Sequence, residues 1–256
     1  GVALAILLKQ RLVEPEILVD IERISSLRYI SDEGGGLRLG ALCTHRDIEK
    51  TPLLKAKFPY LSRAAERIGC VQVRNAGTVG GSLCHADPAS DLPPTLIAVG
   101  AEVSLRSQQG ERTILLEDFF TDYYETALSE GEILTEIRLP PLPARTGVSY
   151  VKFVMREGDM AIVGAAARVT LDDAGERCVD ARVVLGAVAP TPIRVVEAEE
   201  ALRDNPLGER SIIDAAAAAM KASRPLPDFN CSEQYKREMV GVMTKRAISQ
   251  AIQSIS

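Results

Sequence analysis

Residues 73–94, VRNAGTVGGSLCHADPASDLPP, are unlike a segment of a protein core. The stretch has almost no bulky apolar side chain, and six of its small residues are glycines or carry a hydroxyl group: Gly77, Gly80, Gly81, Thr78, Ser82 and Ser90. Glycine allows positive φ values and lets the backbone approach a ligand closely, because no Cβ stands in the way. Successive backbone N–H groups in such a turn can form a concave anion site. We therefore expect the stretch to hold a phosphate or a pyrophosphate.

Two carboxylates in the same stretch narrow the choice of ligand. The sequence lacks the Gly-Lys-Ser/Thr ending of a nucleoside triphosphate loop and the G-x-G-x-x-G spacing of a dinucleotide-binding turn. A pyrophosphate would repel Asp87 and Asp91, so both should face neutral donors or a cation. A carboxylate makes strong hydrogen bonds with hydroxyl groups, which favours a sugar alcohol or a ribose. Flavin adenine dinucleotide (FAD) carries a pyrophosphate and such hydroxyl groups, and we favour it as the ligand.

A purely structural turn is the alternative interpretation of this stretch. Asp91 could cap a helix that begins with Leu-Pro-Pro at residues 92–94, since proline in a first helical turn loses only donors that have no partner anyway. The two interpretations can hold together, and we favour cofactor binding over structure alone.

The stretch resembles the second flavin-binding segment of the medium, FAD-carrying subunit of the molybdenum hydroxylases. That family includes xanthine dehydrogenase and carbon monoxide dehydrogenase. Shorter motifs stand in the order and spacing of the family: Ile68-Gly69, residues 72–75, Phe119-Phe120, residues 133–137 before Pro140, and residues 150–152. The resemblance runs over essentially all 256 residues. Ser82 stands where the family often has an asparagine, and it keeps a hydrogen-bonding side chain there.

The resemblance implies an α+β fold in two domains. Residues 1–141 would form an FAD-binding domain of the vanillyl-alcohol-oxidase-like (PCMH) type. Residues 147–256 would form a domain with a three-stranded antiparallel sheet, covered on one face by a helical layer. The boundary lies in residues 140–147, PPLPARTG, which are rich in residues that break helices and strands.

The family also has some thirty residues before the position of Gly1. They contain an N-terminal strand and a first glycine loop for the FAD pyrophosphate, both of which this sequence lacks, and Gly1 matches the last glycine of that loop. If the molecule began at Gly1, we would expect its FAD affinity to be badly weakened.

The resemblance implies a set of FAD-contacting residues as well. They are Ala76, Thr78, Gly80, Gly81, Ser82, His85, Asp87, Ser90, Asp91, Leu134 and Lys152. Asp91 matches the family's acid near the ribityl chain, and the counterpart of Leu134 lines the flavin ring. Lys152 would place a positive charge beside the pyrimidine edge and stabilise the anionic reduced ring. From the residues alone, Leu134 is equally a buried strand residue and Lys152 equally a residue on a solvated strand face.

The remaining residues with reactive or aromatic side chains give weaker indications of function. Tyr123 matches an aromatic residue near the acceptor side of NAD-using relatives, and a packed tyrosine is an equal alternative. The two histidines, His45 and His85, have no partner at the spacing of metal ligands, so we propose no metal site. We also assign no general acid or base to this chain.

Composition excludes several classes of protein. The chain is 46% hydrophobic and 25% charged with a net charge of −5, so we expect no general attraction for nucleic acid or an anionic membrane. Its five cysteines form no C-x-x-C pair, which fits neither a disulfide framework nor a zinc or iron–sulfur site, and suggests a reducing cytoplasm. The apolar residues 1–8 are too few to cross a bilayer.

Hydrophobic periodicity and the positions of glycine and proline predict the helices and strands. In the first half we expect helices at 1–12, 44–48 (capped by Thr44), 60–68 and 92–99, with a helical turn from 118. Strands are expected at 16–21, in hairpins 27–30/37–40 and 103–106/113–116, and at 132–139. In the second half, three strands (148–155, 161–171 and 179–188) precede three helices (193–202, 212–222 and 232–255).

Taken with the resemblance, the sequence predicts an electron-relay subunit. It would take electrons from [2Fe–2S] clusters of a small subunit and pass them to an external acceptor. A large subunit with the molybdenum cofactor would complete the complex, which would be a dimer of heterotrimers. Two alternatives remain open. One is a stand-alone flavin oxidoreductase of the wider fold, resembling the UDP-N-acetylmuramate reductases, and the other is an assembly module that has lost FAD.

Overall fold

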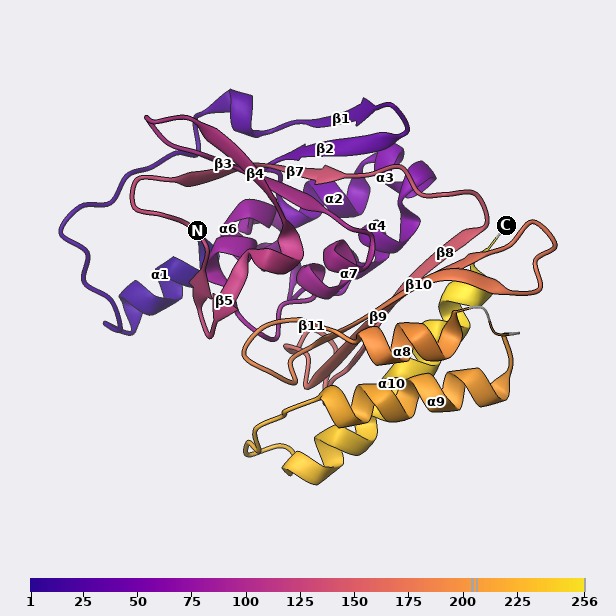
Figure 1. Cartoon of the computed structure of the whole chain (residues 1–256). Coiled ribbons are helices and arrows are strands. Elements are labelled where there is room, and N and C mark those ends of the chain that lie inside the picture. Colours follow the sequence, from indigo (N-terminus) through magenta and orange to yellow (C-terminus); the bar gives the residue numbers. More distant parts are fainter. Residues whose placement is uncertain (204, 206, 256) are drawn as a thin grey trace.

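The computed structural model describes residues 1–203, 205 and 207–255. Its first sheet is five-stranded and antiparallel throughout, in the order β1-β2-β7-β3-β4. The strands are β1 (Ile30–Glu33), β2 (Gly36–Gly40), β7 (Ile133–Leu139), β3 (Glu102–Arg106) and β4 (Glu111–Leu115). β7 therefore lies between two hairpins that are separate in the sequence, and it holds the first half of the chain together (Figure 1).

Six short helices connect β2 to β3 and cover this sheet. They are α2 (His45–Lys50), α3 (Pro52–Lys57), α4 (Pro59–Glu66), α5 (Val71–Ala76), α6 (Val79–His85) and α7 (Leu92–Ala98). The capping of α2 by Thr44 is confirmed: the Thr44 hydroxyl accepts from the Asp47 N–H at 3.0 Å, and the Asp47 carboxylate accepts from the Thr44 N–H at 2.9 Å. α7 is buried along its whole length, since its leucine, isoleucine and proline side chains lie between the two sheets.

The second sheet is four-stranded, with the order β11-β10-β9-β8. Its strands are β8 (Thr146–Phe153), β9 (Val163–Leu171), β10 (Cys178–Gly186) and the two-residue β11 (Ile193–Arg194). The helices that follow are α8 (Val196–Leu202), α9 (Glu209–Ala222) and α10 (Glu233–Gln253). The prediction of three strands was one short, because a two-residue strand has too few residues to display an alternating pattern.

This sheet is covered on both faces rather than on one. Val148, Ala166 and Val184 pack into the first hydrophobic core against α7, while Val151, Ala165 and Val183 pack into a second core with α8 and α10. The molecule thus has four layers: five-stranded sheet, helices α2–α7, four-stranded sheet, helices α8–α10 (Figure 1). The near-continuous buried residues of β9 reflect this double covering.

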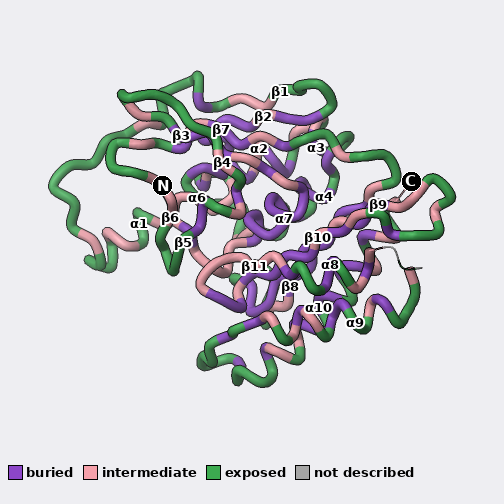
Figure 2. The backbone as a smooth tube through the Cα atoms, viewed as in Figure 1, coloured by how far each residue is buried: buried purple, intermediate pink, exposed green. Residues whose placement is uncertain are grey.

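The N-terminal segment differs most from the expectation. α1 (Val2–Lys9) is present, but the strand predicted at residues 16–21 does not form. In the described part of the chain no strand pairs with this run, and Ile17, Leu18 and Val19 are 60–80% exposed (Figure 2). A β-strand needs a neighbour for its backbone groups, so an apolar run alone does not produce one.

The remaining short elements complete the chain. A 3₁₀ helix, η1 (Ser25–Leu27), precedes β1. A second 3₁₀ helix, η2 (Leu116–Asp118), takes the place of the helical turn predicted to start at 118. It leads into the small hairpin β5 (Phe120–Asp122) and β6 (Glu125–Thr126). Among the described helices, none combines the length and the apolar character that a membrane span requires.

Candidate functional site

The glycine-rich stretch contains the end of α5, the whole of α6 and the start of α7, with α6 as its central element. Thr78 caps α6, and its hydroxyl oxygen accepts from the Gly81 N–H at 3.1 Å. The N–H groups of Val79 and Gly80 donate to carbonyl oxygens of the β2–α2 connection, each at 2.9 Å. These first amides are therefore already paired. The Val79 and Gly80 amides are thus not available to a phosphate, and the hydroxyl groups of Thr78 and Ser82 are candidate donors at this end of α6. The anion site itself stays a prediction.

The adjacent glycines have different surroundings. A Cβ atom on the buried Gly80 would lie 2.6 Å from the Cβ of Ala41 and 2.8 Å from its carbonyl oxygen. A Cβ atom on the exposed Gly81 would meet only the Thr78 hydroxyl oxygen, at 2.8 Å. Gly80 thus allows α6 to pack against Ala41, whereas Gly81 leaves the outer surface of the helix free for a ligand.

Most of the predicted residues of this stretch lie at the surface of α6 and of the turn after it. Ala76 and Gly81 are exposed, Gly80 is buried, and the others are half-buried: Thr78, Ser82, His85, Asp87 and Ser90. The Asp87 carboxylate accepts from the Ala89 N–H at 2.9 Å and so shapes the turn towards α7. The resulting surface combines small residues, hydroxyl groups, an imidazole and a carboxylate, which suits a phosphorylated polyol.

Asp91 and Lys152 form an ion pair in the interior. Lys152 Nζ lies 2.9 Å from Asp91 Oδ2, and the two side chains are only 2% and 4% exposed. The Tyr150 hydroxyl donates to Asp91 Oδ1 at 2.7 Å. Asp91 therefore faces a cation and a neutral donor, and its carboxylate makes no capping bond to α7. The alternative that Lys152 lies on a solvated strand face was wrong, because the side chain is buried.

Lys152 is also saturated with hydrogen-bond partners. Besides Asp91, its ammonium group donates to the carbonyl oxygen of Arg67 at 2.9 Å and to that of Asp159 at 3.0 Å. An ammonium group has three donors, and all three are used. Lys152 therefore joins the end of α4, the start of α7 and the loop after β8, and none of its three N–H donors is left for a ligand.

Burial determines the protonation of this cluster. Burial raises the pKa of Asp91, and the charge and hydrogen bond of Lys152 act against that rise. Burial, reinforced by the charge of Asp91, raises the pKa of Tyr150 well above its ordinary value. The Tyr150 hydroxyl consequently stays protonated and can keep donating to Asp91 at neutral pH.

Leu134 lies in β7 beside α6, with 5% of its surface exposed. Burial raises the pKa of the Cys84 thiol on α6 to about 11, and the nearby backbone of Leu134 acts against that rise. The register between β7 and β3 is interrupted at Thr135, whose carbonyl oxygen accepts instead from the Ala41 N–H at 2.9 Å. Such irregularities are common next to binding sites, because they redirect a residue out of the regular ladder.

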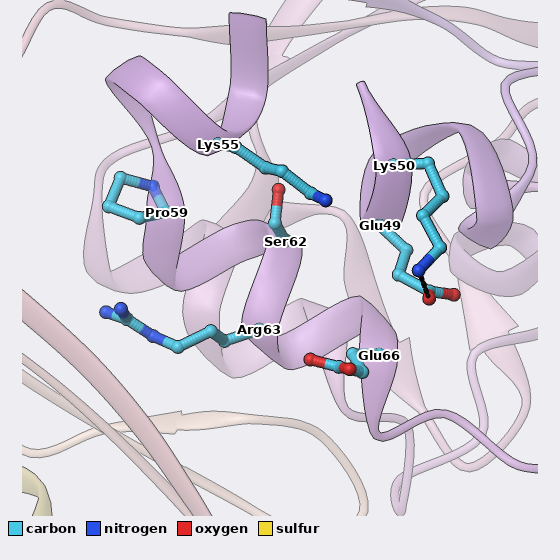
Figure 3. Close-up of a pocket in the computed structure, with 7 residues that line it drawn as sticks. All are labelled: Glu49, Lys50, Lys55, Pro59, Ser62, Arg63 and Glu66. Carbon is cyan, nitrogen blue, oxygen red and sulfur yellow. Dashed lines mark ion pairs between the residues drawn. The ribbon is translucent and has the colours of Figure 1, made fainter. Parts of the chain in front are cut away.

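The structure has two pockets in the half-molecule around α2–α5, and one of them includes Lys152. One, of about 210 Å³, is lined by charged and polar residues of α2 to α4, where Lys50 and Glu49 are 2.9 Å apart (Figure 3). The other, of about 730 Å³, is bordered by Lys152, by residues 66–72 and by the loop 154–159. Its size is in the range of small-molecule and cofactor sites. Neither of these two pockets is lined by residues 76–91.

Two tyrosines belong to the site although the sequence did not single them out. Tyr150 bonds to Asp91, and Tyr124 of the β5–β6 hairpin lies against His85 with ring centroids 5.2 Å apart. The family motif at residues 150–152 could have indicated Tyr150, whereas no feature of the sequence pointed to Tyr124. The described residues contain no group of three or more His, Cys, Asp or Glu that could hold a metal ion, and all five cysteines are free.

Comparisons with known proteins agree with this geometry. The family model described as the FAD binding domain in molybdopterin dehydrogenase matches residues 1–142, and that described as the CO dehydrogenase flavoprotein C-terminal domain matches residues 148–251. The chain is 38% identical to the 6-hydroxypseudooxynicotine dehydrogenase complex subunit alpha of Paenarthrobacter nicotinovorans, over 98% of this chain and 85% of the relative. It is 36% identical to the carbon monoxide dehydrogenase medium chain of Hydrogenophaga pseudoflava, over 98% and 87%.

Solved structures give the same result. Carbon monoxide dehydrogenase from Hydrogenophaga pseudoflava superposes with a TM-score of 0.97 at 37% identity, covering 100% of this chain and 88% of that chain. Quinoline 2-oxidoreductase from Pseudomonas putida 86 superposes with a TM-score of 0.92 at 33% identity, covering 98% and 87%. The fold and the two matched domains are those of a flavoprotein of the molybdopterin dehydrogenases. The chain belongs to the FAD-binding medium subunits of the molybdenum hydroxylase family.

Proposed function

We propose that this chain carries FAD in a molybdenum hydroxylase complex and transfers electrons from [2Fe–2S] clusters to an external acceptor. The observation that carries the proposal is the continuous run of candidate contacts from the surface of α6 to the buried Asp91–Lys152 pair. Small and hydroxyl residues at one end suit the phosphates and the sugar alcohol. The cation at the other end suits a ring that becomes negatively charged on reduction.

The residues proposed to hold FAD keep the set expected from the sequence. They lie at the end of α5 (Ala76), at the cap and in the body of α6 (Thr78, Gly80, Gly81, Ser82 and His85), in the turn before α7 (Asp87, Ser90 and Asp91), in β7 (Leu134) and in β8 (Lys152). When bound, FAD would supply exchange of one electron with iron–sulfur clusters and of two with a hydride acceptor. The protein binds and orients the cofactor, and its buried cation sets the local potential.

The proposal includes partners and a location. Relatives named as a medium chain and as a subunit of a dehydrogenase complex suggest a large subunit with the molybdenum cofactor and a small subunit with [2Fe–2S] clusters, in a dimer of heterotrimers. The free cysteines favour a reducing compartment, and we propose the cytoplasm. We also propose the division into an FAD-binding domain at 1–141 and a C-terminal domain at 147–256.

The second candidate is an assembly module without FAD. It is favoured by the paired amides of Val79 and Gly80 and by the saturated Lys152, because both can be explained by packing alone. Purification of the chain from the cells that naturally produce it decides between the two. The proposed function predicts co-purification with a large molybdenum polypeptide and a small iron–sulfur polypeptide, together with FAD released by denaturing this chain. Co-purification without FAD would support the assembly module, and FAD without partners would support a stand-alone flavoenzyme.

A further inference from the structure

Tyr124 has an unusual backbone conformation for its residue type. It lies in the turn between β5 and β6, where Asp122 pairs with Glu125 and leaves Tyr123 and Tyr124 as the two turn residues. Its φ is +56°, in the left-handed region that glycine and asparagine adopt more readily. A tyrosine there is strained, and such strain persists only where the surrounding structure enforces it.

Burial in the core does not account for this tyrosine, because 57% of its surface is exposed. Its contacts are instead with the end of α6. The ring is tilted by 46° against that of His85, with centroids 5.2 Å apart, and its hydroxyl faces Asp87. Burial of part of the side chain, followed by the charge and hydrogen bond of Asp87, raises the pKa of Tyr124, so the hydroxyl stays protonated.

The end of α6 is itself in an uncommon conformation. Ala86, the residue between His85 and Asp87, has a φ of +52° at the helix C-cap. Two non-glycine residues in the left-handed region, Ala86 and Tyr124, therefore meet where the candidate site turns from α6 towards Asp91. The Tyr124 ring contacts His85 and its hydroxyl faces Asp87, so one side chain restricts the orientation of both neighbours of Ala86.

We propose that Tyr124 is a positioning residue for the cofactor: it holds the His85 ring and the Asp87 carboxylate in the orientation that receives the sugar-alcohol part of FAD. This inference rests on the proposed function. The strain in the turn is then retained because a tyrosine ring at this position organises the binding surface. Tyr123 provides the contrast, since in the part of the chain that the structure describes its side chain is 42% exposed and makes no hydrogen bond or ring contact.

The test uses the full-length protein in its complex, stripped of FAD and titrated with FAD by flavin fluorescence, with the melting temperature of the FAD-free protein measured alongside. Tyr124→Asn removes the ring and relieves the backbone, so we expect about tenfold weaker FAD binding with an unchanged or raised melting temperature. Tyr124→Phe keeps the ring and loses the hydroxyl, so its FAD affinity should lie between those of the wild type and Tyr124→Asn. Tyr123→Asn is the matched control and should change neither quantity.

Two results would overturn the inference. Tyr124→Asn with wild-type affinity would show that the ring is dispensable for binding. A melting temperature that falls together with affinity would make Tyr124 an ordinary structural residue. A wild-type protein that binds no FAD would instead overturn the proposed function, and the inference with it.

Discussion

Lys152 Nζ lies 2.9 Å from Asp91 Oδ2, and this ion pair connects the two halves of the chain. Asp91 precedes α7 in the half that matches the FAD-binding domain, and Lys152 is in β8 of the other half. With Tyr150 donating to the same carboxylate, the pair lies at the junction of the two hydrophobic cores. Residues expected to contact the flavin therefore also determine how the halves pack together.

The first prediction concerns this pair. Asp91→Asn leaves the Lys152 ammonium buried without a counter-charge, so we expect the free energy of unfolding to fall by about 3 kcal/mol. Urea denaturation monitored by far-UV circular dichroism measures it. Combining Asp91→Asn with Lys152→Met should recover part of the loss, because the double variant buries no charge.

An exposed ion pair provides the control. Arg210 and Asp214 lie 3.0 Å apart on α9 with side chains 89% and 48% exposed, so Arg210→Ala should change stability by less than about 0.5 kcal/mol. Equal losses at the buried and the exposed pair would contradict our account of the junction.

The second prediction separates the two adjacent glycines. Gly80→Ala places a Cβ 2.6 Å from the Cβ of Ala41, and we expect it to destabilise the protein by about 2 kcal/mol. Gly81→Ala displaces the Thr78 hydroxyl that caps α6, a loss that the higher helix propensity of alanine offsets, so stability should change by less than about 1 kcal/mol while FAD binds about tenfold more weakly. Thermal unfolding and flavin titration of both variants measure the effects. Full FAD affinity in Gly81→Ala would exclude the outer surface of α6 as the binding face.

The third prediction concerns acid stability. His45 is buried, its Nδ1 has no partner within the described structure, and burial followed by the charge of Arg74 lowers its pKa to about 4. The unfolded chain takes up this proton near pH 6.5, so it binds more protons than the folded chain between these values. Above pH 6.5 His45 therefore does not reduce the free energy of unfolding. As the pH falls towards 4, that free energy decreases by up to about 3 kcal/mol.

The variant His45→Gln tests this loss. It should be less sensitive to acid between pH 6.5 and 4 than the wild type. Unfolding free energies at a series of pH values provide the comparison. Parallel pH curves for the wild type and His45→Gln would rule out His45 as the source.

The fourth prediction uses thiol reactivity. Cys70 is exposed, Cys84 is half-buried, and Cys43, Cys178 and Cys231 are buried. Burial raises the pKa of the Cys43, Cys84 and Cys178 thiols to about 11. Only a thiolate reacts rapidly, so one thiol per native chain should react with a colorimetric disulfide reagent within minutes. Cys70→Ser should abolish that fast phase, and a fast phase that survives in this variant would mean that a buried cysteine becomes accessible.

Local features of the fold could be predicted from the sequence. The Thr44 cap, the hairpin turns and the amphipathic α10 depend on residues a few positions apart, and their elements lie within a few residues of the expected bounds. The place of β7 could not be predicted, because its pairing of Leu37 with Leu139 joins residues about a hundred positions apart. The strand expected at residues 16–21 had the right composition and lacked a partner.

The site was predictable in its composition and less so in its bonding. A carboxylate in an apolar setting requires a cation, and Asp91 has one in Lys152. The sequence offered no way to identify Lys152, about sixty positions further along the chain, as the partner of Asp91. The paired amides of α6 depend on the approach of the β2–α2 connection, which is a tertiary feature. The left-handed backbone of Tyr124 could not be predicted either, because a tyrosine does not indicate this conformation as a glycine does.

The central claim is that this chain holds FAD on the surface of α6 and beside Lys152. The most direct measurement is the FAD content of the full-length protein purified with its partners, taken from flavin absorbance after denaturation and divided by the chain concentration. We predict one FAD per chain in the wild type, and a clear loss in Gly81→Ala at nearly unchanged stability. A folded wild-type complex that contains no FAD and binds none when it is supplied would contradict the account.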